Sequence, residues 1–162
     1  MVLVRMTFET PMAHQAFSLK VSESLFRLVT ESIRLFSNKT LRFANLDDVV
    51  NDRATEVGSL KSCYKPSAFT EHLRIIPTDG DIGVELNILE TSASAIDENM
   101  ADLEEMIGSS ISFTSAISLV LFDFIVEENR TEVMSKLGLN AEDAAAFRAA
   151  ARRSEGNVIP FR

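Results

Sequence analysis

Three aspartates near the end of the first third of the chain have the residue type and spacing to bind a divalent cation. Asp47 and Asp48 are adjacent, and Asp52 follows Asp48 by four residues, so on a helix Asp48 and Asp52 would share one face. Carboxylates on facing helices can hold magnesium for chemistry on phosphorylated small molecules. That chemistry needs a second acidic helix, for which Glu127 and Glu128 are the candidates, and no spacing links them to Asp48. The simpler interpretation is a solvated acidic first turn that favours the helix dipole.

The two histidines, His14 and His72, are the only imidazoles available for phosphotransfer or general-base chemistry. The segment 70–74 resembles in part the phosphoacceptor box of histidine kinases, but its Leu and Arg come one position too early. The sequence also offers no nucleotide-binding domain. A phosphotransfer or two-component accessory role is for these reasons only the third hypothesis. The main alternative is that both histidines lie on helix surfaces or at helix ends and have no chemical role.

Asp123 interrupts an apolar run, with Ser112 and Ser115 nearby in helical angle. A buried carboxylate without a partner is costly, so we expect Asp123 either to bond a basic or hydroxyl group or to face water. The lone Cys63 excludes an intramolecular disulfide and a multi-cysteine zinc site. We expect no cofactor.

Charge also points to a possible interaction surface. The apolar positions from Ile82 to Ile107 step by four and three, as in the seam of a coiled coil. The flanking e positions of this seam are all acidic: Glu90, Asp97 and Glu104. A basic stripe with seven-residue spacing lies earlier in the chain: Lys20, Arg27 and Arg34. We predict that the two helices pack with these stripes facing each other, and the alternative is that both are ordinary solvated faces.

These side chains require helices to position them. Apolar periodicity and capping residues predict three long helices, at about 11–37, 81–107 and 110–137. Shorter helices are predicted at about 46–60, 67–75 and 141–153. The apolar residues of 82–88 also alternate, so a strand is the rival interpretation there, and residues 2–8 show the same alternation. We predict an all-α fold, an elongated antiparallel bundle of the three long helices, with a single domain at 1–153 and a tail at 154–162.

Net charge and the lengths of the apolar stretches limit the classes of partner that we expect. The 162 residues have a net charge of −8, and residues 75–129 carry twelve acidic and no basic side chains. This balance argues against nucleic acid as a partner, and no stretch has the length of apolar residues that a membrane span needs. The start of the chain does not resemble a signal peptide, so we expect a cytoplasmic protein. The leading hypothesis is a non-enzymatic helical protein–protein interaction or regulatory protein, a homodimer that binds an unidentified protein partner. The alternative is a magnesium-dependent all-α hydrolase.

Overall fold

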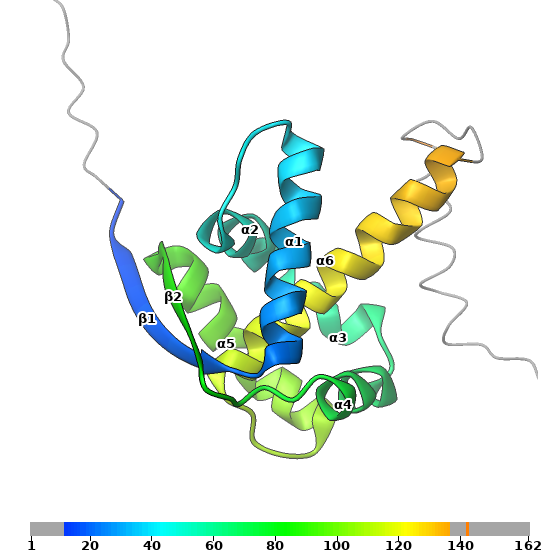
Figure 1. Ribbon diagram of the computed structural model, residues 1–162. Coiled ribbons are helices and arrows are strands. Elements are labelled where there is room, and N and C mark those ends of the chain that lie inside the picture. The colour runs from blue at the N-terminus through cyan, green and yellow to red at the C-terminus, as the bar shows by residue number, and fades with distance from the viewer. Residues whose placement is uncertain (1–11, 137–141, 143–162) are drawn as a thin grey trace, which may run out of the picture.

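The fold is mostly helical, with one small two-stranded sheet (Figure 1). The computed structural model describes residues 12–136 and 142. The elements in chain order are β1 (His14–Val21), α1 (Glu23–Thr40), α2 (Leu46–Arg53), the 3-10 helix η1 (Ala54–Ser59), α3 (Leu60–Cys63), α4 (Pro66–Ile75), β2 (Ile82–Leu89), α5 (Glu90–Ile107) and α6 (Phe113–Lys136). The predicted helix at 141–153 and the tail at 154–162 lie outside the described residues, as do residues 2–8.

The predicted elongated bundle of three long helices is wrong, because two of those helices begin as strands. Residues 14–21 and 82–89 pair antiparallel, with Phe17 opposite Leu86, and the helices α1 and α5 start only after them. The four-residue spacing of Phe17 and Val21 suggested a helix, yet with Leu19 these residues also alternate along a strand. Residues 14–21 form a strand because they pair with residues 82–89, and this pairing provides hydrogen-bond partners for the backbone of both segments.

The rival interpretation of residues 82–88 as a strand is therefore confirmed. The first three residues of the supposed coiled-coil seam, Ile82, Leu86 and Leu89, belong to β2, and the rest lie on α5. That helix packs against η1, α4 and α6. The structure does not support a coiled coil.

The helix predictions at 67–75 and 110–137 agree closely with α4 and α6. The predicted helix at 46–60 is divided between α2 and η1. Asn45 caps α2 in a reciprocal capping box with Asp48, as its spacing predicted. Ser22 caps α1 by accepting a hydrogen bond from the Leu25 N–H.

The core surrounds the first half of α6. Every residue from Ser115 to Leu121 is buried, in keeping with a helix that is apolar nearly all round. Helix α1 packs against α6 and α2, and the inner face of the sheet contributes the buried residues Leu19, Val21, Leu86 and Ile88. No helix in the described part of the chain has the length and apolar character to cross a membrane.

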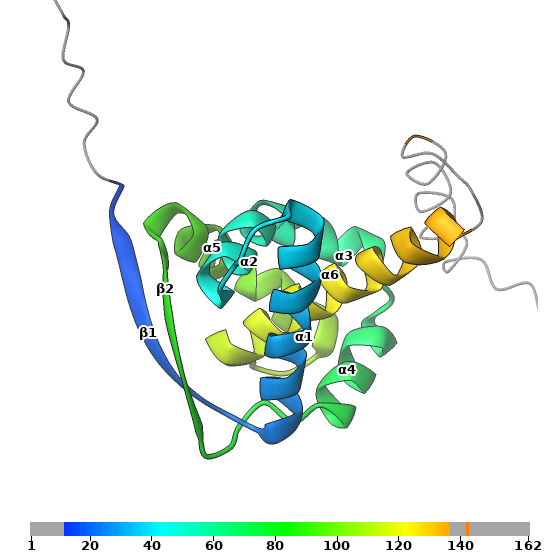
Figure 2. The same ribbon diagram turned by 45° about the horizontal axis from the view of Figure 1, so that its top comes forward.

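The sheet lies at one side of the molecule, with β1 outermost and β2 between β1 and the helices (Figures 1 and 2). At the end of β1, the residues that lead into β2 pass very close to the backbone of Val21 and Ser22. A Cβ placed on Gly80 would lie 2.5 Å from the Ser22 Cα, so only glycine fits there. This close approach fixes where β1 ends and α1 begins.

Candidate functional site: the open edge of strand β1

The two edges of the sheet differ in how their backbone groups are satisfied. Beside β2, the N–H groups of Asn87 and Leu89 donate to the side-chain oxygens of Asp47 and Asn51 on α2, at 2.8 and 3.0 Å. These two side chains close the β2 edge at those positions. Exposed strand edges are templates for unwanted pairing, and covering them with a helix is a common protection.

Among the residues that the structure describes, none covers the outer edge of β1 from His14 to Ser18 in this way. Since the N–H groups of Asn87 and Leu89 point away from β1, their partners Ala16 and His14 point their own backbone groups away from β2. The same alternation applies to Ser18 and Lys20. Within the described residues, β1 pairs with β2 alone apart from an isolated bridge at Val21. The bridge joins Val21 to Asp79 in an antiparallel pattern in which the Ser22 N–H donates to the Thr78 carbonyl at 3.1 Å and the Lys20 carbonyl faces the Gly80 N–H, so the open edge extends from His14 to the Lys20 N–H.

Two polar side chains on the exposed face of β1, those of Ser18 and Lys20, are turned toward β2 rather than outward past the edge. The Ser18 hydroxyl donates to the carboxylate of Glu85, at 2.8 Å to its nearer oxygen. The Nζ of Lys20 lies 3.8 Å from the point where a Cβ would stand on Gly83. Lysine on an edge strand often guards against pairing, but this ammonium group lies over the neighbouring strand.

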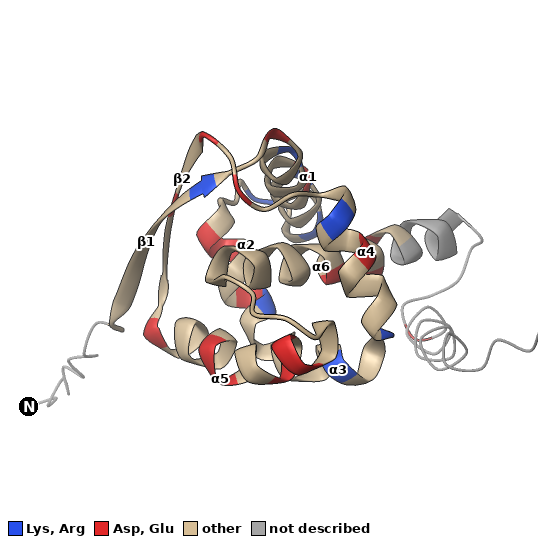
Figure 3. Cartoon of the chain, turned by 90° about the horizontal axis from the view of Figure 1, so that it is seen from below, with Lys and Arg blue, Asp and Glu red and all other residues tan. Residues whose placement is uncertain are grey.

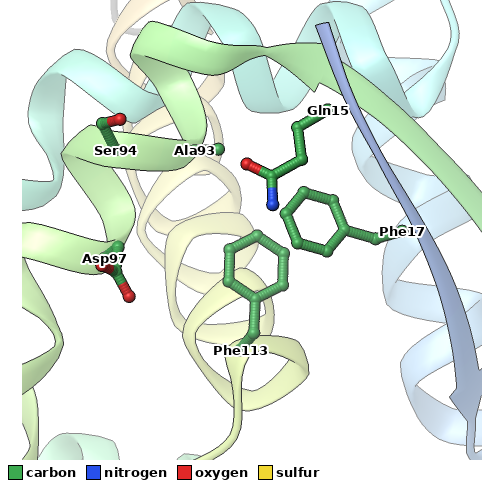
Figure 4. A pocket seen from close by; sticks show the side chains of 6 residues that line it. All are labelled: Gln15, Phe17, Ala93, Ser94, Asp97 and Phe113. Atoms are coloured by element: carbon green, nitrogen blue, oxygen red, sulfur yellow. The ribbon is translucent and has the colours of Figure 1, made fainter.

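A groove of about 230 Å³ lies under the sheet beside this edge (Figure 4). Its lining residues come from β1, α5 and the start of α6: Gln15, Phe17, Ala93, Ser94, Asp97 and Phe113. The rings of Phe17 and Phe113 stack with centroids 4.2 Å apart, and Phe17 stays half-buried. An added strand would therefore meet open backbone groups on β1 and a partly apolar groove below it.

The described structure gives most of the predicted metal ligands other partners. Asp48 accepts the Asn45 N–H in the capping box, and Asp52 is exposed on the same helix. Glu127 bonds Arg53 and Glu128 pairs with Lys39, so neither faces Asp48 as a shared ligand. In the described part of the chain, no group of three or more His, Cys, Asp or Glu residues could hold a metal ion.

The predicted charged stripes are not on two facing helices. Lys20 lies on β1, while Arg27 and Arg34 on α1 form ion pairs with Glu23 and Glu31 of the same helix. Along α5, Glu90 and Asp97 are exposed, and Glu104 accepts the Ile111 N–H at 3.2 Å. Figure 3 shows the acidic residues recurring along α5. A basic residue of α3, Lys61, pairs with Glu105 and Asp102 of that helix at 3.3 and 3.7 Å.

Asp123 has the partners that the sequence left open. It accepts from Arg53 at 2.7 Å and from the Tyr64 hydroxyl at 2.6 Å, and Arg53 also bonds Glu127 at 2.9 Å. Burial alone would lower the pKa of Arg53, but Glu127 and Asp123 outweigh burial and raise it above its usual value. This buried ion cluster joins α2 and α6 to Tyr64, the residue that follows α3. The Nε of Arg53 is buried without a hydrogen-bond partner.

His72 is a core histidine. Its Nε2 lies 2.8 Å from the Ser118 hydroxyl and its ring packs on Phe122, at 4.6 Å between centroids. Burial lowers its pKa to about 4, with the hydrogen bond to Ser118 opposing the shift. At neutral pH the imidazole is therefore uncharged. The other histidine, His14, is exposed at the start of β1.

This low pKa makes the stability of the protein depend on pH. An unfolded chain protonates His72 near its ordinary pKa of 6.5, whereas the folded chain resists protonation until about 4. The protonation of His72 therefore leaves the free energy of unfolding unchanged above pH 6.5. As the pH falls from 6.5 to 4, it lowers the free energy of unfolding by up to about 3 kcal/mol. We expect urea unfolding of His72→Gln to show a weaker loss of stability than the wild type across this range. His14→Gln, a change at an exposed site, serves as the control and keeps the wild-type dependence. Parallel curves for wild type and His72→Gln would contradict the assignment.

A second groove, of about 370 Å³, lies between α1 and α4. Leu28, Ile76 and Phe122 contribute to its apolar lining, and Ile75 beside it is exposed. Glu71 and His72 line it as well, and no strand of the described residues borders it.

Comparison with known proteins does not assign this chain to a family. No protein-family model, curated protein or solved structure matches the chain.

Proposed function

We propose that this chain is a non-enzymatic protein–protein interaction protein that binds an extended partner segment along the open edge of β1. The observation that carries the proposal is the difference between the two edges of the sheet. Side chains of α2 bond the backbone of the β2 edge, whereas among the described residues no strand pairs with the outer edge of β1 from His14 to the Lys20 N–H. Strand addition is a common mode of recognition in which backbone hydrogen bonds give affinity and neighbouring pockets give specificity. The groove at Phe17 and Phe113 is such a neighbouring pocket.

The charged and polar clusters support this choice over the two alternatives. Asp48 is engaged in the capping box, and among the described residues there is no group of three or more His, Cys, Asp or Glu side chains that could hold the metal ion of a magnesium-dependent hydrolase. The imidazole of His72 is buried against Ser118 and Phe122, an environment that suits packing better than phosphotransfer. In the part of the chain that the structure describes, no specific contact favours either reaction.

The proposal is tested by blocking the edge without disturbing the sheet. Ala16→Pro removes an N–H that points away from β2, and proline is tolerated on an edge strand at such a position. Ala16→Val is the matched control because it keeps that N–H. A library of short extended peptides is selected on the wild-type protein, and the selected peptides are then measured on both variants.

We expect the selected peptides to bind Ala16→Pro at least about tenfold more weakly than the wild type, since each lost backbone bond contributes about 1 kcal/mol and the pyrrolidine ring blocks the approach. Binding to Ala16→Val should change little. Circular dichroism and urea unfolding establish that both variants are folded. Peptides that bind Ala16→Pro as tightly as the wild type would show that the edge is not the binding surface.

A further inference from the structure

The partner of the open edge can be narrowed from the geometry and charge of β1. We propose that a second copy of this chain pairs with it, β1 against β1, antiparallel and centred on Phe17. This inference rests on the proposed use of the edge and names its occupant. It adds a register, which fixes which side chains meet.

The extent of the open edge fixes the register. The outward backbone groups belong to His14, Ala16, Ser18 and Lys20, and the segment 78–80 occupies the Lys20 carbonyl and the Ser22 N–H at the end of this stretch. Phe17 is the midpoint of the open stretch. An antiparallel pair of identical strands has a two-fold axis, so a pair centred on Phe17 uses the open groups of both copies except the His14 N–H, which lies opposite the occupied Lys20 carbonyl. A pair centred on Ser18 would place His14 opposite the occupied Ser22 and shorten the ladder.

The charges of β1 permit this approach. Two copies of a chain with a net charge of −8 repel each other, yet residues 14–21 contain no Asp or Glu. In the register centred on Phe17, Ala16 lies opposite Ser18 and His14 lies opposite Lys20, so no two carboxylates meet across the new pair. Lys20 already holds its ammonium group over β2, away from the open edge.

The inner face gains an apolar contact in the same register. Phe17 of one copy lies opposite the partner's Phe17 in a non-hydrogen-bonded pair, where side chains approach most closely. The partner's Leu19 lies opposite Gln15, on the rim of the groove that Phe17 and Phe113 line. Pairing therefore covers the exposed part of Phe17 and extends the two small sheets into one of four strands.

Light scattering on the full chain, over a range of concentrations, tests the oligomeric state. We expect the wild type and Ala16→Val to have twice the monomer mass, and Ala16→Pro to have the monomer mass under the same conditions. A wild-type chain that remains monomeric overturns the inference, whether residues 1–11 or another protein then covers the edge. A dimer that persists in Ala16→Pro overturns it as well, because the copies then meet elsewhere.

Cross-linking tests the register. In a Cys63→Ser background, one chain carries Ala16→Cys and the other Ser18→Cys. These positions oppose each other as a hydrogen-bonded pair with a Cα separation of about 5.5 Å, within disulfide range. We expect a disulfide-linked dimer only when the two variants are mixed. Efficient self-linking of Ser18→Cys indicates the register centred on Ser18 and contradicts the one proposed.

The two experiments separate the failure of this inference from that of the proposed function. If selected peptides bind the wild type and lose affinity for Ala16→Pro while the wild type stays monomeric, the edge binds a different partner. If neither the peptides nor the dimer respond to Ala16→Pro, both proposals are wrong.

Discussion

Replacing Asp123 with alanine is expected to lower the free energy of unfolding by about 3–5 kcal/mol, one of the two largest effects of a single substitution that we predict. The side chains of Arg53 and Asp123 are only 8% and 5% exposed, so neither charge is well solvated. Removing the carboxylate leaves the Arg53 guanidinium with Glu127 and takes away the acceptor of the Tyr64 hydroxyl. A buried charge that loses a partner costs far more than an exposed one.

The matched control is Glu23→Ala, which removes the carboxylate of an exposed ion pair with Arg27. That change should cost under about 1 kcal/mol. Urea denaturation at neutral pH measures both. An Asp123→Ala protein as stable as Glu23→Ala would mean that water replaces the carboxylate and that the cluster does not hold the helices together.

The second large effect is expected at Phe69, whose substitution by alanine should cost about 3–5 kcal/mol. Phe69 is fully buried, and its ring lies 5.2 Å from that of Tyr64 and 6.4 Å from that of Phe122. Truncation removes contacts on both sides and leaves a cavity between α4 and α6. Phe69→Leu, which fills part of this space, should cost less.

Phe43→Ala tests whether the loss comes from burial rather than from phenylalanine itself. Phe43 is fully exposed in the loop between α1 and α2, so its truncation should change the free energy of unfolding by no more than about 0.5 kcal/mol. Thermal or urea unfolding of the three variants gives the comparison. Equal losses for Phe69→Ala and Phe43→Ala would contradict the packing at Phe69.

Local signals predicted the parts of the fold that depend on neighbours in sequence. The all-round apolar character of residues 111–126 indicated a central helix, and α6 is one. The capping spacing of Asn45 and Asp48 predicted the start of α2. Both features are decided within one or two helical turns.

The strands could not be predicted in this way. Ile82, Leu86 and Leu89 fit a heptad, while Ile82, Val84, Leu86 and Ile88 fit a strand, so periodicity alone gives two answers. The pairing of β2 with residues 14–21 decides between them, and that partner is more than 60 residues away. The candidate site was missed for the same reason, because an open strand edge cannot be foreseen before the strands are known.

The partners of Asp123 show a similar limit. The sequence indicated that this carboxylate needs a basic or hydroxyl partner, and Arg53 and Tyr64 provide both. Which residues would do so depends on how α2 and α3 pack on α6, which no spacing encodes.

The contacts of α2 have a consequence for how the molecule comes apart. A two-stranded ribbon is marginal in isolation, and this one is bonded through Asp47 and Asn51 to a helix that ends at Arg53, in the ion cluster with α6. The ribbon and the central helix are thus joined through a short helix of eight residues. Fraying of the sheet should accordingly be coupled to release of α6, so that segments far apart in sequence melt as one cooperative unit.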